Sequence, residues 1–185
     1  MFSEELEPRV YVTTYAKYKQ GKTTGEWLEI INYSTYEAFI QACRDLHSDE
    51  ENPEFMFLHR NDIPYNLCNE SKIFREYFEI KQFVQTLDES DAEAFKLWFD
   101  YYEIDPRRCA TETIFHYFQN TYMGRFVEDE FFKYFLNNFY NIPEDLRLFV
   151  NYDFYKKKIN EEFLEMDGYY FRQMRVFSRP TKTKL

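Results

Sequence analysis

The sequence has little glycine, little proline and no pattern of paired cysteines. Its 185 residues include 4 Gly and 6 Pro, too few for a collagen-like sequence or a flexible linker. Its three cysteines, Cys43, Cys68 and Cys109, are odd in number and widely spaced. Small secreted domains use paired cysteines, so we expect a protein of a reducing compartment whose cysteines are small buried side chains.

Long hydrophobic segments are also missing. No apolar run approaches the roughly 18 residues of a membrane-spanning helix. Residues 1–9 are acidic, whereas a secretory signal begins with a basic segment and continues with an apolar one. We therefore expect a soluble cytoplasmic protein of a bacterial cell that does not bind membranes.

The motifs of common active sites are absent as well. The histidines His47, His59 and His116 do not have the spacing of zinc ligands. Gly21 and Gly25 are not followed by the Gly-Lys-Ser/Thr of a phosphate-binding loop, and no serine lies in a Gly-x-Ser-x-Gly motif. Carboxylate pairs such as Glu50-Glu51 arise by chance among 33 acidic residues. We expect no catalytic residue, no metal, no cofactor and no small-molecule substrate.

Acidic and aromatic side chains are what the sequence has in excess. It holds 33 acidic and 23 basic residues, for a net charge of −10, together with 21 Phe and 17 Tyr. Aromatic residues make up 22% of the chain, enough to fill cores, which excludes an acidic disordered segment. The chain is therefore expected to be folded and to present an acidic surface.

The acidic charge is unevenly distributed. Residues 1–62 hold 12 acids and 6 bases, residues 63–115 hold 11 and 6, and residues 116–185 hold 10 and 11. Residues 175–185 contain four bases and no acid, and we expect them to form a flexible basic tail. Since nucleic-acid binding needs a basic patch, we expect the acidic body not to bind nucleic acid.

The pattern of the first 70 residues predicts a small antiparallel sheet with one helix. Strands are expected at residues 10–15, 27–30 and 54–59, which are rich in β-branched and aromatic residues. The helix between the second and third strands is expected to begin at Ser34, because Ser34 and Glu37 fit a capping box. Its apolar stripe contains Tyr36, Phe39, Ile40, Cys43 and Leu46.

The remaining sequence predicts a helical segment followed by a mixed one. Helices are expected after Ser71, after the capping box Ser90–Glu93, and from Asp105-Pro106. Residues 114–118 fit either a strand or the end of a helix. Further helices are expected at 127–139 and 153–163, and Asp167-Gly168 indicates a turn before a strand. The fold class is α+β, an elongated chain of small domains at 9–70, 71–113 and 114–174.

The helix expected around residues 131–140 has two apolar stripes. Phe131, Phe135 and Phe139 are spaced by four, and Tyr140 belongs to the neighbouring stripe. One stripe is enough to bury a helix on a small core, so we expect the dimer interface to contain Phe131, Phe135, Phe139 and Tyr140. The alternative is that this helix is buried on both sides within its own domain.

Several segments together resemble one known family. The segments 9–18 and 25–28, with 55–64, 142–153 and 167–172, occur in order and resemble the ArdA antirestriction family. The resemblance implies acidic, elongated homodimers of three small domains. Such proteins bind in the DNA-binding groove of Type I restriction–modification enzymes without catalysing a reaction and protect mobile genetic elements. The family's interface segment corresponds to residues 131–142 here.

The charge is adequate for such a DNA mimic. Residues 1–174 hold 33 acids and 19 bases, so a dimer of this body carries −28, the charge of roughly 48 Å of B-DNA. The alternatives are an acidic module that binds another basic DNA-binding protein and, less favoured, an enzyme. The acids that we expect to contact the partner lie in the first two thirds of the chain: Glu26, Glu29, Asp45, Asp49, Glu50, Glu51, Glu54, Asp62, Glu89, Asp91 and Glu93.

Overall fold

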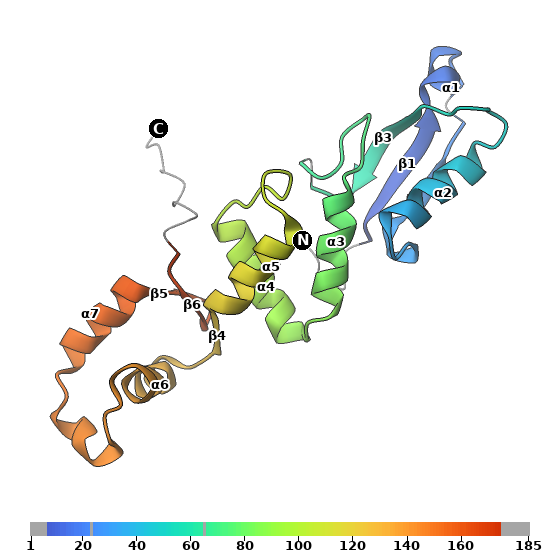
Figure 1. Ribbon diagram of the computed structural model, residues 1–185. Coiled ribbons are helices and arrows are strands. Elements are labelled where there is room, and N and C mark those ends of the chain that lie inside the picture. The colour runs from blue at the N-terminus through green and yellow to red at the C-terminus, as the bar shows by residue number, and fades with distance from the viewer. Residues whose placement is uncertain (1–6, 23, 65, 175–185) are drawn as a thin grey trace, which may run out of the picture. The chain divides into compact units, whose positions relative to one another are not determined.

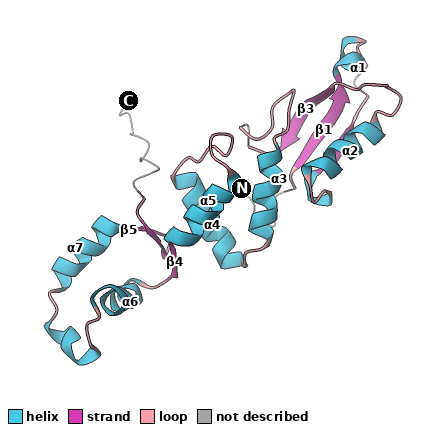
Figure 2. Cartoon of the chain, in the orientation of Figure 1, coloured by secondary structure: helices cyan, strands magenta, loops and turns pink. Residues whose placement is uncertain are grey.

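The computed structural model describes residues 7–22, 24–64 and 66–174, and the basic tail expected at 175–185 lies outside them. The described residues form two small antiparallel sheets of three strands each, together with helices, so the α+β class is confirmed (Figure 1, Figure 2). The chain divides into two compact units. Unit 1 comprises 1–88 and 105–111, and unit 2 comprises 89–104 and 112–185. The division into three domains stays a prediction.

The sheet of unit 1 has the strand order β2-β1-β3, with both pairings antiparallel. Its strands are β1 (Arg9–Thr14), β2 (Glu26–Glu29) and β3 (Phe55–Asn61), which confirms the three strands that the sequence predicted. The short helix α1 (Tyr15–Lys19) follows β1 directly and was not predicted. Gly25 precedes β2 where a Cβ atom would lie 2.2 Å from the carbonyl oxygen of Val12, so the chain needs glycine at this position.

Helices cover one face of this sheet. They are the 3-10 helix η1 (Ile30–Asn32), α2 (Tyr36–Leu46) and α3 (Arg75–Gln85). The prediction that Ser34 caps α2 is wrong, because the side chain of Thr35 accepts the hydrogen bond from the Ala38 amide. The apolar stripe of α2 is confirmed, since Phe39 and Cys43 are buried and the other predicted residues pack against them.

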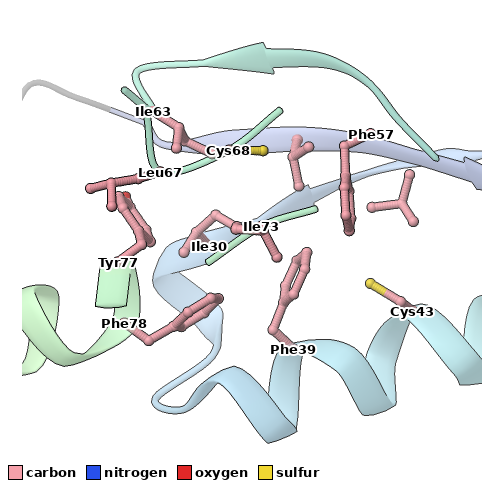
Figure 3. Packing of buried hydrophobic residues seen from close by; sticks show 12 residues of the cluster. Ile30, Phe39, Cys43, Phe57, Ile63, Leu67, Cys68, Ile73, Tyr77 and Phe78 are labelled. Carbon is pink, nitrogen blue, oxygen red and sulfur yellow. The ribbon is translucent and has the colours of Figure 1, made fainter. Parts of the chain in front are cut away.

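The core of unit 1 lies between the sheet and these helices. Figure 3 shows Phe39 and Cys43 of α2 facing the strands, with Tyr77 and Phe78 of α3 beside them. The rings of Phe39 and Phe78 lie 5.6 Å apart. The α3 helix begins at Arg75 after the N-cap Phe74, so the helix predicted after Ser71 is present.

Unit 2 begins with a pair of helices. They are α4 (Glu89–Tyr101) and α5 (Thr111–Thr121), and the rings of Phe95 and Phe118 on them lie 5.1 Å apart. Ser90 lies inside α4, so its prediction as a cap is wrong. Asp105 and Pro106 form a turn instead of starting a helix. Residues 114–118, which the sequence left open, are helical.

The rest of unit 2 consists of a sheet and further helices. The sheet has the strand order β4-β6-β5, made of β4 (Tyr122–Arg125), β5 (Phe163–Met166) and β6 (Tyr169–Arg172). The helices are α6 (Glu128–Tyr140), the 3-10 helix η2 (Glu144–Phe149) and α7 (Tyr152–Glu162). Asp167 and Gly168 have φ of 52° and 84°, the left-handed geometry of a tight hairpin turn, as their sequence predicted.

Candidate functional site

The acids that the sequence proposed for partner contact lie almost entirely on the surface. Nine of the eleven are exposed, and Glu50 and Asp91 are half-buried. They come from four places: β2, the segment 45–54, the turn after β3 and the start of α4. Five of them, Asp45, Asp49, Glu50, Glu51 and Glu54, lie in the last turn of α2 and the loop that follows it.

Two of the loop acids surround a lysine of α1. Nζ of Lys17 lies 2.8 Å from Asp49 and 3.7 Å from Glu50, and it lies 3.0 Å from Nδ1 of His47. The hydroxyl of Thr14 donates a 2.6 Å hydrogen bond to Glu50. The hydrogen bond from Lys17 lowers the pKa of Asp49. These acids therefore attach the loop to α1 in addition to adding surface charge.

The same groups have the arrangement of a cation site. His47, Asp49 and Glu50 offer ligand atoms that lie within 4.8 Å of one another. The sequence did not reveal that Lys17 contacts this cluster, because Lys17 and His47 are 30 residues apart. The ammonium group of Lys17 contacts all three side chains, so they already bind a positive charge from the chain itself.

Two of the α4 acids are attached to tyrosines of the sheet in unit 2. The hydroxyl of Tyr169 donates a 2.7 Å hydrogen bond to Glu93. Burial and a hydrogen bond to Asp91 raise the pKa of Tyr122. Asp91 and Glu93 therefore hold α4 against β4 and β6, a structural role that the sequence did not indicate. Glu89, in the same first turn, is exposed.

Other exposed acids add to this surface and were not among the predicted ones. These acids occur in both units and include Glu70, Asp88, Asp100, Glu103, Glu112, Asp129, Glu144 and Asp145. Asp100, Glu112 and Asp129 lie on α-helices at positions outside the apolar stripes, and this helical spacing is the sequence signal that could have identified these three. The acidic surface is therefore broader than the predicted set.

The four residues proposed for a dimer interface differ in exposure. Phe131 and Phe135 are buried in the core of unit 2, Phe139 packs against that core, and Tyr140 is 40% exposed. The strongly exposed apolar residues of unit 2 are Val127, just before α6, and a group that comes later in the chain: Leu146, Leu148, Phe149, Tyr152 and Phe154. Among them, Leu148 is 91% and Phe149 is 84% exposed.

Two of the thiols are buried, and unit 2 contains a cavity with many aromatic residues in its lining. Burial raises the pKa of Cys43 to about 12 and that of Cys68 to about 11, so both thiols are protonated at neutral pH. A cavity of about 770 Å³ lies between α6, α7 and the sheet of unit 2. Its lining is aromatic, with charged groups such as Arg125, Glu130 and Lys156, and contains no serine, cysteine or histidine.

Comparisons with known proteins complete the description of the chain. Among the residues that the structure describes, no helix combines the length and the apolar character needed to cross a membrane. A protein-family model described as "Antirestriction protein (ArdA)" matches residues 10–172. Neither the curated proteins nor the solved structures contain a match.

Proposed function

The chain belongs to the ArdA family of antirestriction proteins, and we propose that it inhibits Type I restriction–modification enzymes by binding in their DNA-binding groove as an acidic DNA mimic. Membership of this family implies an antirestriction function, and the family consists in general of inhibitors without catalytic activity. The observation that carries the mimic mechanism is the exposure of nine of the eleven predicted acids.

Charge spacing supports a phosphate-like role for these acids. B-DNA carries about one charge per 1.7 Å of its axis, and the segment 45–54 alone has five carboxylates. Because Asp49 and Glu50 are paired with Lys17, the exposed acids Asp45, Glu51 and Glu54 of this segment are the ones best placed to meet a basic groove.

We also propose that the protein acts as a homodimer through unit 2. Its apolar surface segment comprises residues 140–154, which join the end of α6 to the start of α7. The rings of Tyr140 and Tyr155 lie 4.9 Å apart, and those of Phe132 and Tyr152 lie 4.6 Å apart. The helices α6 and α7, which the segment joins, therefore contact each other. Exposed Leu148 and Phe149 lie between them, and a second copy is the simplest cover for such a surface.

A competition assay tests the mimic mechanism. The protein is titrated into a complex of duplex DNA with a purified Type I methyltransferase core, and bound DNA is followed by fluorescence anisotropy. A mimic displaces the DNA, and its potency falls as salt concentration rises because the attraction is electrostatic. A DNA-binding curve that stays unchanged at excess protein would refute the proposal. An acidic control protein of similar net charge shows whether charge alone is sufficient.

A further inference from the structure

The sheet of unit 1 carries an aromatic patch on the face opposite its core. Because side chains alternate along a strand, Val10 and Leu28 point into the core while Tyr11, Trp27 and His59 share the other face. Tyr11 of β1 is paired with Trp27 of β2 and with His59 of β3. Tyr11, Trp27 and His59 are called the aromatic patch below.

The three rings form one continuous group. The centroids of Tyr11 and Trp27 lie 5.6 Å apart, those of Tyr11 and His59 lie 6.3 Å apart, and those of Trp27 and His59 lie 6.4 Å apart. Trp27 is 40% exposed and His59 is exposed, while Tyr11 is half-buried. The group therefore presents aromatic surface to solvent instead of closing a core.

The chain itself shows which chemistry this surface accepts. The guanidinium carbon of Arg9 lies 5.0 Å from the ring centroid of Trp27, the geometry of a cation–π contact. Arg9 is paired in register with Glu29 of β2. In this arrangement a guanidinium group stacks on an indole ring and a carboxylate lies on the neighbouring strand. The side chain of a second arginine can make the same kind of contact with this face of the sheet.

A carboxylate borders the aromatic patch. Glu29 lies two residues after Trp27 in β2 and therefore on the same face of the sheet, and it is exposed. An aromatic surface bordered by negative charge favours cations, and guanidinium groups stack on aromatic faces better than ammonium groups do. The charge of the whole chain, −10, acts in the same direction.

From these observations we propose that the aromatic patch binds an arginine side chain of a basic protein surface, with the guanidinium stacked on Trp27 and paired with a neighbouring carboxylate. This inference rests on the proposed function, in which the partner surface is a DNA-binding groove. It adds to that function a stacking contact that duplex phosphates do not offer. Because stacking is screened less than ion pairs between exposed charges, it maintains binding as salt concentration rises.

A peptide titration tests the chemistry without the restriction enzyme. The chain has two tryptophans, and Trp98 is fully buried, so a ligand at the surface changes mainly the emission of Trp27. Hexa-arginine should quench this emission saturably and at lower concentration than hexa-lysine, and the quenching should disappear in the Trp27→Ala variant. Equal quenching by the two peptides would overturn the proposal, as would saturable quenching by oligo-dT, which would indicate base stacking.

A second experiment places the patch in the inhibitory complex. Trp27→Ala should weaken displacement of DNA from the methyltransferase core about tenfold, with the same salt dependence as the unchanged protein. Tyr18→Ala is the matched control, because Tyr18 is an aromatic residue of unit 1 that is 47% exposed in α1; this variant should bind normally. A folded Trp27→Ala variant of full potency would overturn the inference.

The two experiments separate the two proposals. If the unchanged protein quenches with hexa-arginine but never displaces DNA, the arginine chemistry holds and the proposed function fails. If it displaces DNA but Trp27→Ala is fully potent, the function holds and the inference fails. Circular dichroism of Trp27→Ala checks that the sheet is intact, and Trp27→Phe, which retains a ring, should recover part of the potency.

Discussion

Nζ of Lys17 lies 3.0 Å from Nδ1 of His47, so a charged donor faces a ring nitrogen that must be unprotonated to accept it. Burial and the charge of Lys17 lower the pKa of His47. His47 is 1% exposed and forms the C-cap of α2. Protonating it would place two positive charges side by side where α1 contacts the acidic segment 45–54.

Stability should therefore fall on acidification. The pKa of His47 is lower in the folded protein than its ordinary value of 6.5, so below that value the unfolded chain binds more protons than the folded one. Urea unfolding midpoints should decrease as the pH falls from 7.5 to 5. His47→Gln should remove most of this dependence, whereas the exposed His116→Gln variant should retain it. Identical midpoints across this range would contradict the prediction. Asp49 does not interfere, because its lowered pKa lies below the range.

Lys81 should contribute strongly to the stability of unit 1. Its buried ammonium donates to the carbonyls of Ile30 at 2.9 Å and Tyr33 at 2.9 Å, and more weakly to that of Ile31. Lys81→Met leaves these carbonyls without their donor and should destabilise the protein by about 2 kcal/mol in urea unfolding. Lys19→Met, at an exposed position of α1, is the control and should change stability by less than about 0.5 kcal/mol.

Two glycines of the loop between α1 and β2 should respond differently to alanine. A Cβ at Gly25 would lie 2.2 Å from the carbonyl oxygen of Val12, whereas at Gly21, with φ of 68°, it would meet no atom within 4 Å. Gly21→Ala should therefore cost about 1 kcal/mol through backbone strain alone. Gly25→Ala must displace β1 or β2 and should be clearly more destabilising in the same denaturation assay. Equal losses would show that the close approach is not required.

The sequence predicted the elements that have strong local patterns. The strands around Val10 and Phe57 and the helices with regular apolar stripes, such as α2 and α6, are present. It missed α1 and β4, which have five and four residues, too few to show a period. The capping prediction for Ser34 failed because Thr35 caps α2 instead, and that for Ser90 failed because α4 already begins at Glu89.

The site was predictable in composition and not in detail. Exposed acids follow from the sequence because carboxylates avoid cores. The partners of these acids do not, since Glu93 and Tyr169 are 76 residues apart and Lys17 and His47 are 30 apart. Local patterns contain no information on such contacts. The aromatic patch was missed for the same reason, because Tyr11, Trp27 and His59 come together only through strand pairing.

The dimer proposal predicts different outcomes for two sets of residues. Replacing exposed Leu148 and Phe149 with lysine should give a folded monomer, seen as half the mass in light scattering with an unchanged circular dichroism spectrum. Replacing Phe135, which is fully buried, with aspartate should instead unfold unit 2, because a charge in the core has no partner. A Leu148→Lys/Phe149→Lys variant that remains a dimer would exclude this segment as the interface.

The acids should separate into those that stabilise the fold and those that bind the partner. Glu93 accepts a hydrogen bond from Tyr169, so Glu93→Ala should lower the stability of the protein by about 1 kcal/mol and change DNA displacement little. Glu51 and Glu54 are exposed. Glu51→Gln and Glu54→Gln should leave the unfolding midpoint unchanged, and each should weaken binding by about 0.2–1 kcal/mol, the range of exposed ion pairs.

A variant that combines substitutions of three exposed acids tests whether recognition is distributed over the surface. A mimic distributes its recognition over many carboxylates, so Asp45→Asn, Glu51→Gln and Glu54→Gln together should weaken displacement roughly as the sum of the single effects. DNA displacement by this triple variant should also depend less steeply on salt concentration, because fewer ion pairs form with the basic groove. Loss of all binding from one of these substitutions would instead locate recognition at a single site and contradict a distributed mimic. Displacement assays at two salt concentrations, with Glu93→Ala as the stability control, distinguish these outcomes.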